Sequence, residues 1–342
     1  MIPPAPIRRP LTVTAWVVVS ALWLLLSPLL LALAAAAAAV IRRPQPLIAA
    51  RLATSYFAYE LGVLIACAGL WLLSGFGAAM HTPRIKRLHY RLLRWFVHGL
   101  AQRVVELLDI RVAPGATAEA ARALAAERPL LFLSRHAGPA DTLLLIDELL
   151  WRYDRRPSIV FKQALTLDPC VDLIGHRLPH AILDTSNTER SEAEIRKVTA
   201  QMGPRGVLVL FPEGGNFTPK RRREALSRLR RKGRRREAAA GESMSHMMPP
   251  HPAGAIAAFR GSGETDVIFA AHTGLGLAAF PREMWRHPPI GRTLHTRMWL
   301  APAPERPKDP ERQTEWLYDW WQRLNQWVET QGKEPIGTGE TA

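Results

Sequence analysis

The sequence predicts an α/β domain, with a mostly parallel sheet flanked by helices, preceded by N-terminal membrane helices. Short apolar runs at residues 130–133, 206–211 and 266–271 are typical of buried strands. Stretches with helical periodicity separate these runs, and that alternation is typical of parallel strands joined by crossover helices. Two long runs without a charged residue, at 11–40 and 61–80, come before the domain and are the candidate membrane helices.

The first uncharged run, residues 11–40, is thirty residues long. About twenty apolar residues span a bilayer, and a cleaved signal peptide has an apolar core of only about 7–15 residues. A membrane helix is therefore favoured over a signal peptide. The second run, residues 61–80, follows Glu60. It can cross the bilayer or lie beside the first run as a hairpin, so the sequence fits either one span or two.

The basic residues around these runs predict the orientation of the anchor, because cytoplasmic loops carry an excess of Lys and Arg. Three basic residues lie between the runs: Arg42, Arg43 and Arg51. Seven lie outside them: Arg8, Arg9, Arg84, Lys86, Arg87, Arg91 and Arg94. The sequence therefore predicts a protein of the cell membrane with both ends of the anchor, and the domain that follows, on the cytoplasmic side.

Four regions follow from these patterns. Residues 1–80 form the membrane anchor, and residues 81–117 form an amphipathic helix with a linker. The helix has a basic first half, so it is interpreted either as an interfacial helix on the membrane or as a helix that covers a core. Residues 118–333 form the α/β domain, and residues 334–342 are expected to be a disordered tail.

The chain is strongly basic, with a net charge of +15, which favours anionic partners such as membrane lipids, phosphate-bearing substrates or nucleic acid. Residues 220–236 alone hold eleven Lys and Arg residues and one Glu. This run contains no aromatic residue that could stack on a base, so nucleic acid is not expected. It is interpreted either as a solvated loop or as a surface for anionic head groups.

Metal and nucleotide chemistry has no support in the sequence. The two cysteines, Cys67 and Cys170, do not form a paired metal motif, and Cys67 lies in an apolar run. A disulfide framework is therefore not expected. None of the common zinc, phosphate-loop or dinucleotide motifs occurs, so the sequence predicts neither a metal site nor a bound cofactor.

His136 and Asp141 form the first motif that carries chemistry, and they flank the turn at Gly138 and Pro139. On one straight helix the two side chains would point about 140° apart, so they can meet only where the chain bends between a strand and a helix. A carboxylate bonded to one imidazole nitrogen raises the basicity of the other nitrogen, which makes His136 a candidate general base. The alternative is that Asp141 only caps a helix and His136 is a loop histidine, because the H-x4-D spacing alone is weak.

The second motif follows the clearest strand in the chain, residues 206–211, which continues into the Phe211-Pro212-Glu213-Gly214 segment. In this order, and about seventy-five residues apart, the H-x4-D and F-P-E-G motifs resemble those of the glycerophospholipid acyltransferases. That family acylates glycerol phosphate and lysophosphatidic acid. The two motifs together are much more specific than either one alone.

The resemblance covers roughly residues 80–300 and implies a function. It assigns His136 as the general base, supported by Asp141, and the F-P-E-G segment as part of the acceptor site. It implies a membrane-anchored enzyme of phospholipid biosynthesis and lipid metabolism that moves a fatty acyl group from acyl-CoA to a hydroxyl of a lysophospholipid. The expected acceptor is 1-acylglycerol 3-phosphate, and acyl-CoA, or another acyl thioester such as acyl-carrier protein, is a co-substrate rather than a cofactor. The alternative is a non-catalytic lipid-binding or scaffold protein on the same fold.

Several positions depart from the pattern of the family. Arg135 precedes the histidine where Asn is usual, Thr185 stands where Arg is usual, and Gly215-Asn216 replaces Thr-Arg after the second motif. The family uses several of these positions around the acceptor phosphate, so the reaction type is better supported than the acceptor. The nearest basic residues by motif position, and the expected substrate-binding cations, are Lys162, Arg177 and Lys220.

Overall fold

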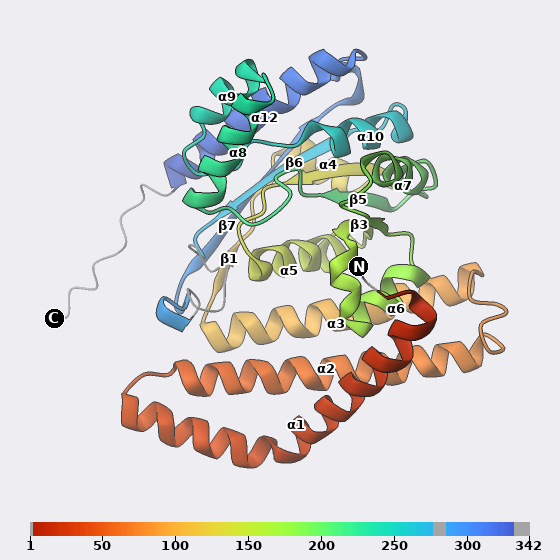
Figure 1. The fold of residues 1–342 in the computed structure, drawn as a ribbon, viewed down its shortest axis with the longest axis vertical. Coiled ribbons are helices and arrows are strands. Elements are labelled where there is room, and N and C mark those ends of the chain that lie inside the picture. The colour runs from red at the N-terminus through yellow and green to blue at the C-terminus, as the bar shows by residue number, and fades with distance from the viewer. Residues whose placement is uncertain (1–2, 276–284, 332–342) are drawn as a thin grey trace.

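The computed structural model describes residues 3–275 and 285–331, and its centre is a seven-stranded sheet (Figure 1). The strand order is β1-β7-β6-β2-β5-β3-β4, and all neighbours are parallel except β6 and β7, which are antiparallel. The predicted α/β class with a mostly parallel sheet is confirmed. The predicted tail, residues 334–342, lies outside the described residues. The strands are β1 (Arg111–Ala113), β2 (Leu130–Ser134), β3 (Arg156–Lys162), β4 (Ala181–Leu183), β5 (Gly206–Leu210), β6 (Val267–Thr273) and β7 (Thr293–Ala301).

Helices cover both faces of the sheet because alternate residues of the central strands point to opposite sides. Leu131 and Leu133 of β2 belong to a core shared with α7, α10 and α12, whereas Leu130 and Phe132 pack with α4, α5 and the turn after α5. The helices are α1 (Ala5–Ile41), α2 (Gln45–Leu73), α3 (Pro83–Leu108), α4 (Ala118–Ala125), α5 (Pro139–Asp147), α6 (Pro169–Arg177), α7 (Thr188–Ala200), α8 (Pro219–Arg231), α9 (Arg235–Glu242), α10 (Pro252–Ser262) and α12 (Pro310–Gln331), with shorter turns at Glu148–Arg152, Gln163–Leu167 and Ala303–Glu305.

The N-terminal helices lie beneath the domain, with α3 next to it and α2 below α3, while α1 crosses them from its start beside α6 to its outermost end below α2 (Figure 1). By length and composition, α1 and α2 are both long and apolar enough to cross a membrane. The second helix differs from the predicted run at 61–80, since it begins at Gln45 and ends at Leu73. It ends there because the next turn contains Gly75 and Gly77, both with a positive φ.

The predicted amphipathic helix is confirmed as α3. Its apolar face is occupied by protein, because Leu93 and Val97 are buried in a cluster with Val63 of α2 and Ile174 of α6. This packing fits a helix that covers a core. The interfacial role of its basic side stays a prediction.

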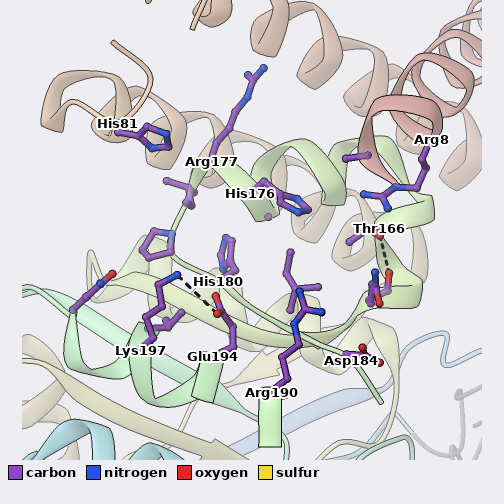
Figure 2. Close-up of a pocket in the computed structure, with 18 of the residues that line it drawn as sticks. Arg8, His81, Thr166, His176, Arg177, His180, Asp184, Arg190, Glu194 and Lys197 are labelled. Carbon is purple, nitrogen blue, oxygen red and sulfur yellow. Dashed lines mark hydrogen bonds and ion pairs between the residues drawn. The ribbon is translucent and has the colours of Figure 1, made fainter. Parts of the chain in front are cut away.

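The sheet ends at β4, which pairs with β3 and no other described strand. A cavity lies beside β4, where residues of α6 and α7 approach the beginnings of α1 and α3 (Figure 2). Strand β4 therefore forms part of a concave surface as well as the end of the sheet.

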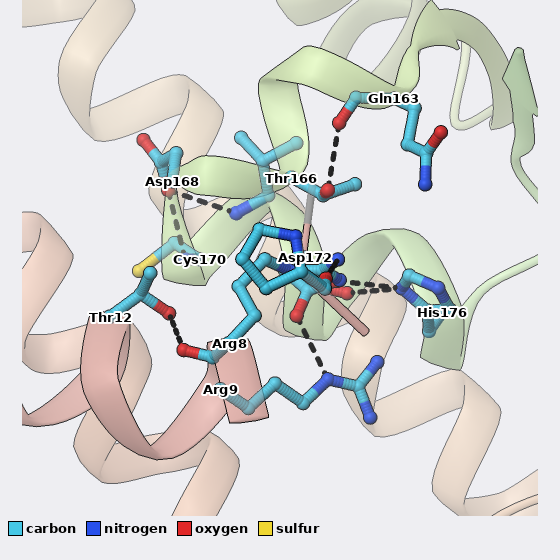
Figure 3. A network of polar contacts seen from close by, with 11 residues as sticks. Arg8, Arg9, Thr12, Gln163, Thr166, Asp168, Cys170, Asp172 and His176 are labelled. Carbon is cyan, nitrogen blue, oxygen red and sulfur yellow. Dashed lines mark hydrogen bonds and ion pairs between the residues drawn. The ribbon is translucent and has the colours of Figure 1, made fainter. Parts of the chain in front are cut away.

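A buried ion-pair cluster fixes the beginning of α1 to α6 (Figure 3). The carboxylate of Asp172 is fully buried and accepts hydrogen bonds from Arg8 Nη2 at 2.7 Å and Arg9 Nε at 2.8 Å. His176 Nδ1 lies 3.0 Å from the same carboxylate. Burial alone would raise the pKa of Asp172, but the hydrogen bonds and charges of these three partners outweigh it and lower the pKa. Asp172 is therefore ionised and pairs with Arg8, which is itself only 5% exposed.

Candidate active site

Three strand ends and one helix start position His136. It lies two residues beyond β2, which pairs with β5 on one side and β6 on the other, so the carboxyl ends of three parallel strands meet there. Gly138 then ends the turn as the N-cap of α5. The carboxyl ends of such strands are where α/β sheets commonly place ligands, and this half-buried histidine has the expected location.

The contacts of His136 determine which ring nitrogen is basic. Its Nδ1 lies 3.1 Å from Thr142 Oγ1, and the Thr142 hydroxyl donates its one hydrogen to Gly138 O, also at 3.1 Å. The hydroxyl must therefore accept a hydrogen bond from Nδ1–H, which leaves the lone pair on Nε2. The ring also packs against Phe211, with 4.9 Å between ring centroids. Thr142 thus occupies the place expected for Asp141.

Asp141 lies against His272 instead. Its Oδ2 is 3.5 Å from His272 Nδ1, and no hydrogen bond between Asp141 and His136 occurs within the described part of the chain. The expectation that Asp141 is the N-cap is also wrong, because Gly138 holds that position and Asp141 is the third residue of α5. Burial raises the pKa of Asp141 to about 7, although the nearby Arg135 charge opposes this.

His272 lies between Asp141 and the backbone carbonyl of Arg135, the residue before His136. It lies on β6, and its Nε2 donates to Arg135 O at 3.0 Å, because a carbonyl can only accept. Its Nδ1 therefore presents a lone pair to Asp141. One feature of the sequence indicates this contact, since His272 is near the end of an apolar strand, but no pattern in the sequence indicates that β6 is next to β2.

Glu213 joins the two sequence motifs. It is buried, and its Oε2 accepts from His136 N–H at 3.4 Å while its Oε1 accepts from Trp321 Nε1 at 3.3 Å. Burial raises the pKa of Glu213 to about 8, with Arg135 opposing the shift. The structure thus brings the F-P-E-G segment against the H-x4-D turn, and Glu213 holds the backbone of His136.

The other residues of this segment have distinct positions. Phe211 supports the imidazole, and Pro212 O accepts from His251 N–H at 2.8 Å. Gly214 has a φ of 68°, and a Cβ there would lie 3.1 Å from a carbon of the His251 ring. A larger residue at Gly214 would therefore be strained both in backbone and in space.

Arg135 is the cation beneath the site, and sequence reasoning identified it only as a departure from the family pattern. Its guanidinium is buried and donates to His272 O at 2.5 Å and to His246 O at 3.1 Å. The same positive charge acts on both Asp141 and Glu213. The charge of one buried arginine therefore limits the rise in pKa that burial causes in two carboxyl groups, those of Asp141 and Glu213.

The three expected substrate-binding cations do not converge. Lys162 reaches the site, since its exposed Nζ donates to Gly214 O at 2.7 Å. Lys220 is exposed in the first turn of α8. Arg177 is directed elsewhere and fastens α6 to α2, because its Nη1 donates to Cys67 O at 2.8 Å. Its role at the acceptor phosphate stays a prediction.

The positive charges that act on His136 come from Lys162, which was expected, and from Arg221, which was not. Burial, followed by these two charges, lowers the pKa of His136 to about 4. Arg221 belongs to the basic run at 220–236, and the sequence did not single it out. His136 is therefore neutral at neutral pH, as a general base must be.

One group of residues has the composition of a metal site, at Glu60, Asp168 and Cys170. The Asp168 carboxylate is already engaged, because Oδ1 accepts from the backbone N–H groups of Cys170 and Val171, and Oδ2 accepts from the Tyr56 hydroxyl. This cluster caps α6 and joins it to α2. It is separate from the residues around His136.

A comparison with protein-family models gives a match in the part of the chain that contains His136. Residues 116–252 match the family model described as Acyltransferase. Both sequence motifs lie within the matched residues, and the match supports the resemblance to the glycerophospholipid acyltransferases, a family that acts on acyl donors and lipids in general. No curated protein and no solved structure gives a significant match.

Proposed function

We propose that the protein is a membrane-anchored acyltransferase that moves a fatty acyl group from acyl-CoA to a hydroxyl of a lysophospholipid, with 1-acylglycerol 3-phosphate as the acceptor. The observation that carries this proposal is the neutral His136, whose Nε2 accepts no hydrogen bond from any residue that the structure describes, at the point where the two motifs meet. The long apolar helices α1 and α2 support the membrane anchor.

The geometry suggests a direct transfer. His136 Nε2 removes the proton of the acceptor hydroxyl as its oxygen attacks the thioester carbonyl. The carbon–sulfur bond then breaks, and the departing thiolate takes the proton from His136. A lowered His136 pKa favours this second transfer, because the imidazolium releases its proton readily. Lys162 supplies positive charge beside the base.

A non-catalytic lipid-binding or scaffold protein is the second candidate. It is favoured by the contact between Asp141 and His272, which leaves His136 without its expected carboxylate. The position of Arg135, where the family usually has Asn, points the same way. The two candidates differ in turnover rather than in lipid binding.

The test is an acyl-transfer assay with the purified full-length protein, radiolabelled acyl-CoA and a series of lysophospholipid acceptors. We expect labelled product with 1-acylglycerol 3-phosphate above the protein-free background. A monoacylglycerol arm tests whether the phosphate is needed, and an acyl-carrier-protein arm tests the donor. Binding of the acceptors without turnover on any of them would support the scaffold candidate.

Thr142 provides a test of the proposed tautomer. Replacing Thr142 with Val removes the acceptor for His136 Nδ1–H, so the ring is free to protonate on Nε2 and kcat should fall by about tenfold or more, with little change in KM. Thr142→Ser keeps the hydroxyl and is the matched control, with kcat close to that of the wild type. Equal kcat values for the Val and Ser proteins would show that another group orients His136.

The pH dependence of kcat should report the low pKa of His136. The base works only when neutral, so activity should persist above its pKa of about 4 and fall as the pH drops through that value. An unperturbed histidine would place this acid limb near 6.5. The measurement is kcat against pH, with tryptophan fluorescence as a control for folding. An acid limb at about 7 or 8 would instead point to Asp141 or Glu213.

The proposed orientation has the acyltransferase domain on the cytoplasmic side, because basic residues are in excess at both ends of the anchor. The pairing of Arg8 with Asp172 keeps the start of α1 on the same side as the domain. In a background without Cys67 and Cys170, Arg43→Cys should react with an impermeant maleimide in intact cells. Glu264→Cys should react only after the cells are opened. The reverse labelling would rule out this orientation.

A further inference from the structure

The cavity beside β4 has a volume of about 600 Å³ and is lined by several separate parts of the chain (Figure 2). His176 and Arg177 come from α6, and Arg190 and Lys197 come from α7, while the starts of α1 and α3 complete it. Among the described residues, it is lined by none of the groups that contact His136. It is therefore distinct from the candidate active site.

A second cavity, of about 320 Å³, continues the first along α3. The residues that line both cavities are His81, Lys86, Pro179, Val198 and Gln201. We call the two cavities together the basic groove. It follows one face of β4, since His180 and Ile182 are two residues apart and both line it.

The lining of the basic groove is strongly positive. Asp184 and Glu194 are its acidic residues, and Glu194 lies 3.9 Å from Lys197. The basic residues that line it are Arg8, Lys86, Arg87, Arg156, Arg177, Arg190, Lys197 and Arg205. A concave surface with this excess of one charge concentrates oppositely charged ligands.

Several of these cations already have protein partners, whereas Lys86 is available to a ligand. Arg8 pairs with Asp172, and Arg177 donates to Cys67 O. The Lys86 ammonium has no hydrogen bond or ion pair to any residue that the structure describes, although its side chain is half-buried in the lining of both cavities. Removing a cation partly from water without a partner is unfavourable unless a ligand restores the lost interactions.

His180 adds a neutral hydrogen-bond donor. Its Nδ1 accepts from Ile159 N–H at 2.9 Å, so its Nε2 carries the ring hydrogen. The side chain is buried, and burial lowers its pKa to about 4, so it remains neutral at neutral pH. A neutral donor with fixed orientation, in a cavity that is also lined by Arg and Lys, is suited to an oxygen-rich anion.

We propose that the basic groove binds a phosphate ester. Arginine holds phosphate through paired hydrogen bonds, and lysine adds a point charge. The groove is large enough for a lipid head group or for a nucleotide. The two sources share the same phosphate chemistry: the head group of an anionic phospholipid, or a soluble phosphate ester. The proposal does not depend on the acyl-transfer activity.

The location of the groove makes a lipid head group the first source to test. Its rim includes Arg8 at the start of α1 and His81 shortly after the end of α2. These are the points at which the chain enters and leaves the two long apolar helices. Head groups of the adjoining lipids would lie at the same level as the groove.

The experiment measures ligand binding by the full-length protein in neutral detergent, as a rise in the midpoint of thermal unfolding followed by tryptophan fluorescence. The lipid probe is dihexanoyl phosphatidylglycerol, with zwitterionic dihexanoyl phosphatidylcholine as its control. The soluble probe is adenosine 3′,5′-bisphosphate. Each probe is titrated against the wild type, the Lys86→Gln/Arg190→Gln double variant, and His136→Ala.

A matched double variant controls for the loss of two positive charges. Lys308→Gln/Arg312→Gln changes two exposed residues around the start of α12, and neither residue lines the basic groove. Removing Lys86 and Arg190 should weaken the apparent affinity for the anionic probe by about tenfold or more, because hydrogen bonds to charged groups are the strong ones. The α12 variant and His136→Ala should bind as the wild type does.

The outcomes separate the two sources. A response to phosphatidylglycerol alone assigns a lipid head group, and a response to the bisphosphate alone assigns a soluble phosphate ester. The proposal is overturned if neither anionic probe raises the unfolding midpoint, or if the groove variant and the α12 variant respond equally. The unfolding midpoints without ligand, which should agree within a few degrees, show whether the groove variant is folded.

Discussion

Replacing His136 with Ala should lower kcat by about 10²–10⁴-fold, the usual contribution of a general base. The structure leaves the Nε2 lone pair of this histidine free and keeps the ring neutral at neutral pH. Acceptor and donor binding should change little, because the imidazole supplies chemistry rather than most of the contact surface. Turnover and membrane association are measured on the same preparations.

The exposed His287 offers a matched control, and His287→Ala should keep the activity of the wild type. Asp141→Asn provides a second comparison. Since Asp141 contacts His272 and not His136, its loss of kcat should be smaller than that of His136→Ala. An equal loss would mean that Asp141 turns to His136 during the reaction, whereas a His136→Ala protein with near-normal kcat would exclude the proposed base.

Replacing Asp172 with Ala should lower the free energy of unfolding by about 3–5 kcal/mol, the range found when one partner of a buried ion pair is removed. Asp172 is fully buried and pairs with both Arg8 and Arg9. The Ala variant leaves the Arg8 guanidinium, only 5% exposed, without its counter-charge. The measurement is denaturant unfolding in detergent, followed by tryptophan fluorescence.

An exposed ion pair gives the matched control for this prediction. Glu119→Ala breaks the exposed pair with Arg122 on α4 and should change the free energy of unfolding much less than Asp172→Ala does. A rescue variant that joins Asp172→Leu with Arg8→Met should recover much of the lost stability, because apolar groups can replace a buried pair. If Asp172→Ala unfolds as the wild type does, the cluster does not hold α1 in solution.

The core of the site was predictable because it depends on local chain order. The strand before His136 and the strand before Phe211 are both short apolar runs, and parallel strands bring their carboxyl ends to one edge. The partners of the side chains were less predictable. Asp141 meets His272 only because β6 pairs with β2, and spacing along the chain does not reveal that neighbour. The contact between Thr142 and His136 is only weakly indicated by the sequence. Thr142 is a hydroxyl residue in the first turn of a helix, shortly after Gly138.

The limits of the second long helix were missed for an energetic reason. The absence of charge predicted a run at 61–80, but α2 begins at Gln45 and includes both Arg51 and Glu60. Glu60 is buried beneath the domain, where protein groups rather than lipid surround it. A prediction from hydropathy alone treats every neighbouring group as lipid. It therefore placed the start of the helix after Glu60, the nearest charged residue.

The pairing of Arg8 with Asp172 also has a consequence for biogenesis. The two residues are 164 positions apart, so Asp172 is made well after α1 has left the ribosome. At about 5–20 residues per second, α1 waits on the order of ten to thirty seconds for its partner. During that interval Arg8 and Arg9 keep their charges in water or among lipid head groups. The first helix to be synthesised is therefore fastened to the domain only after α6 has been made, and its attachment reports that α6 has folded.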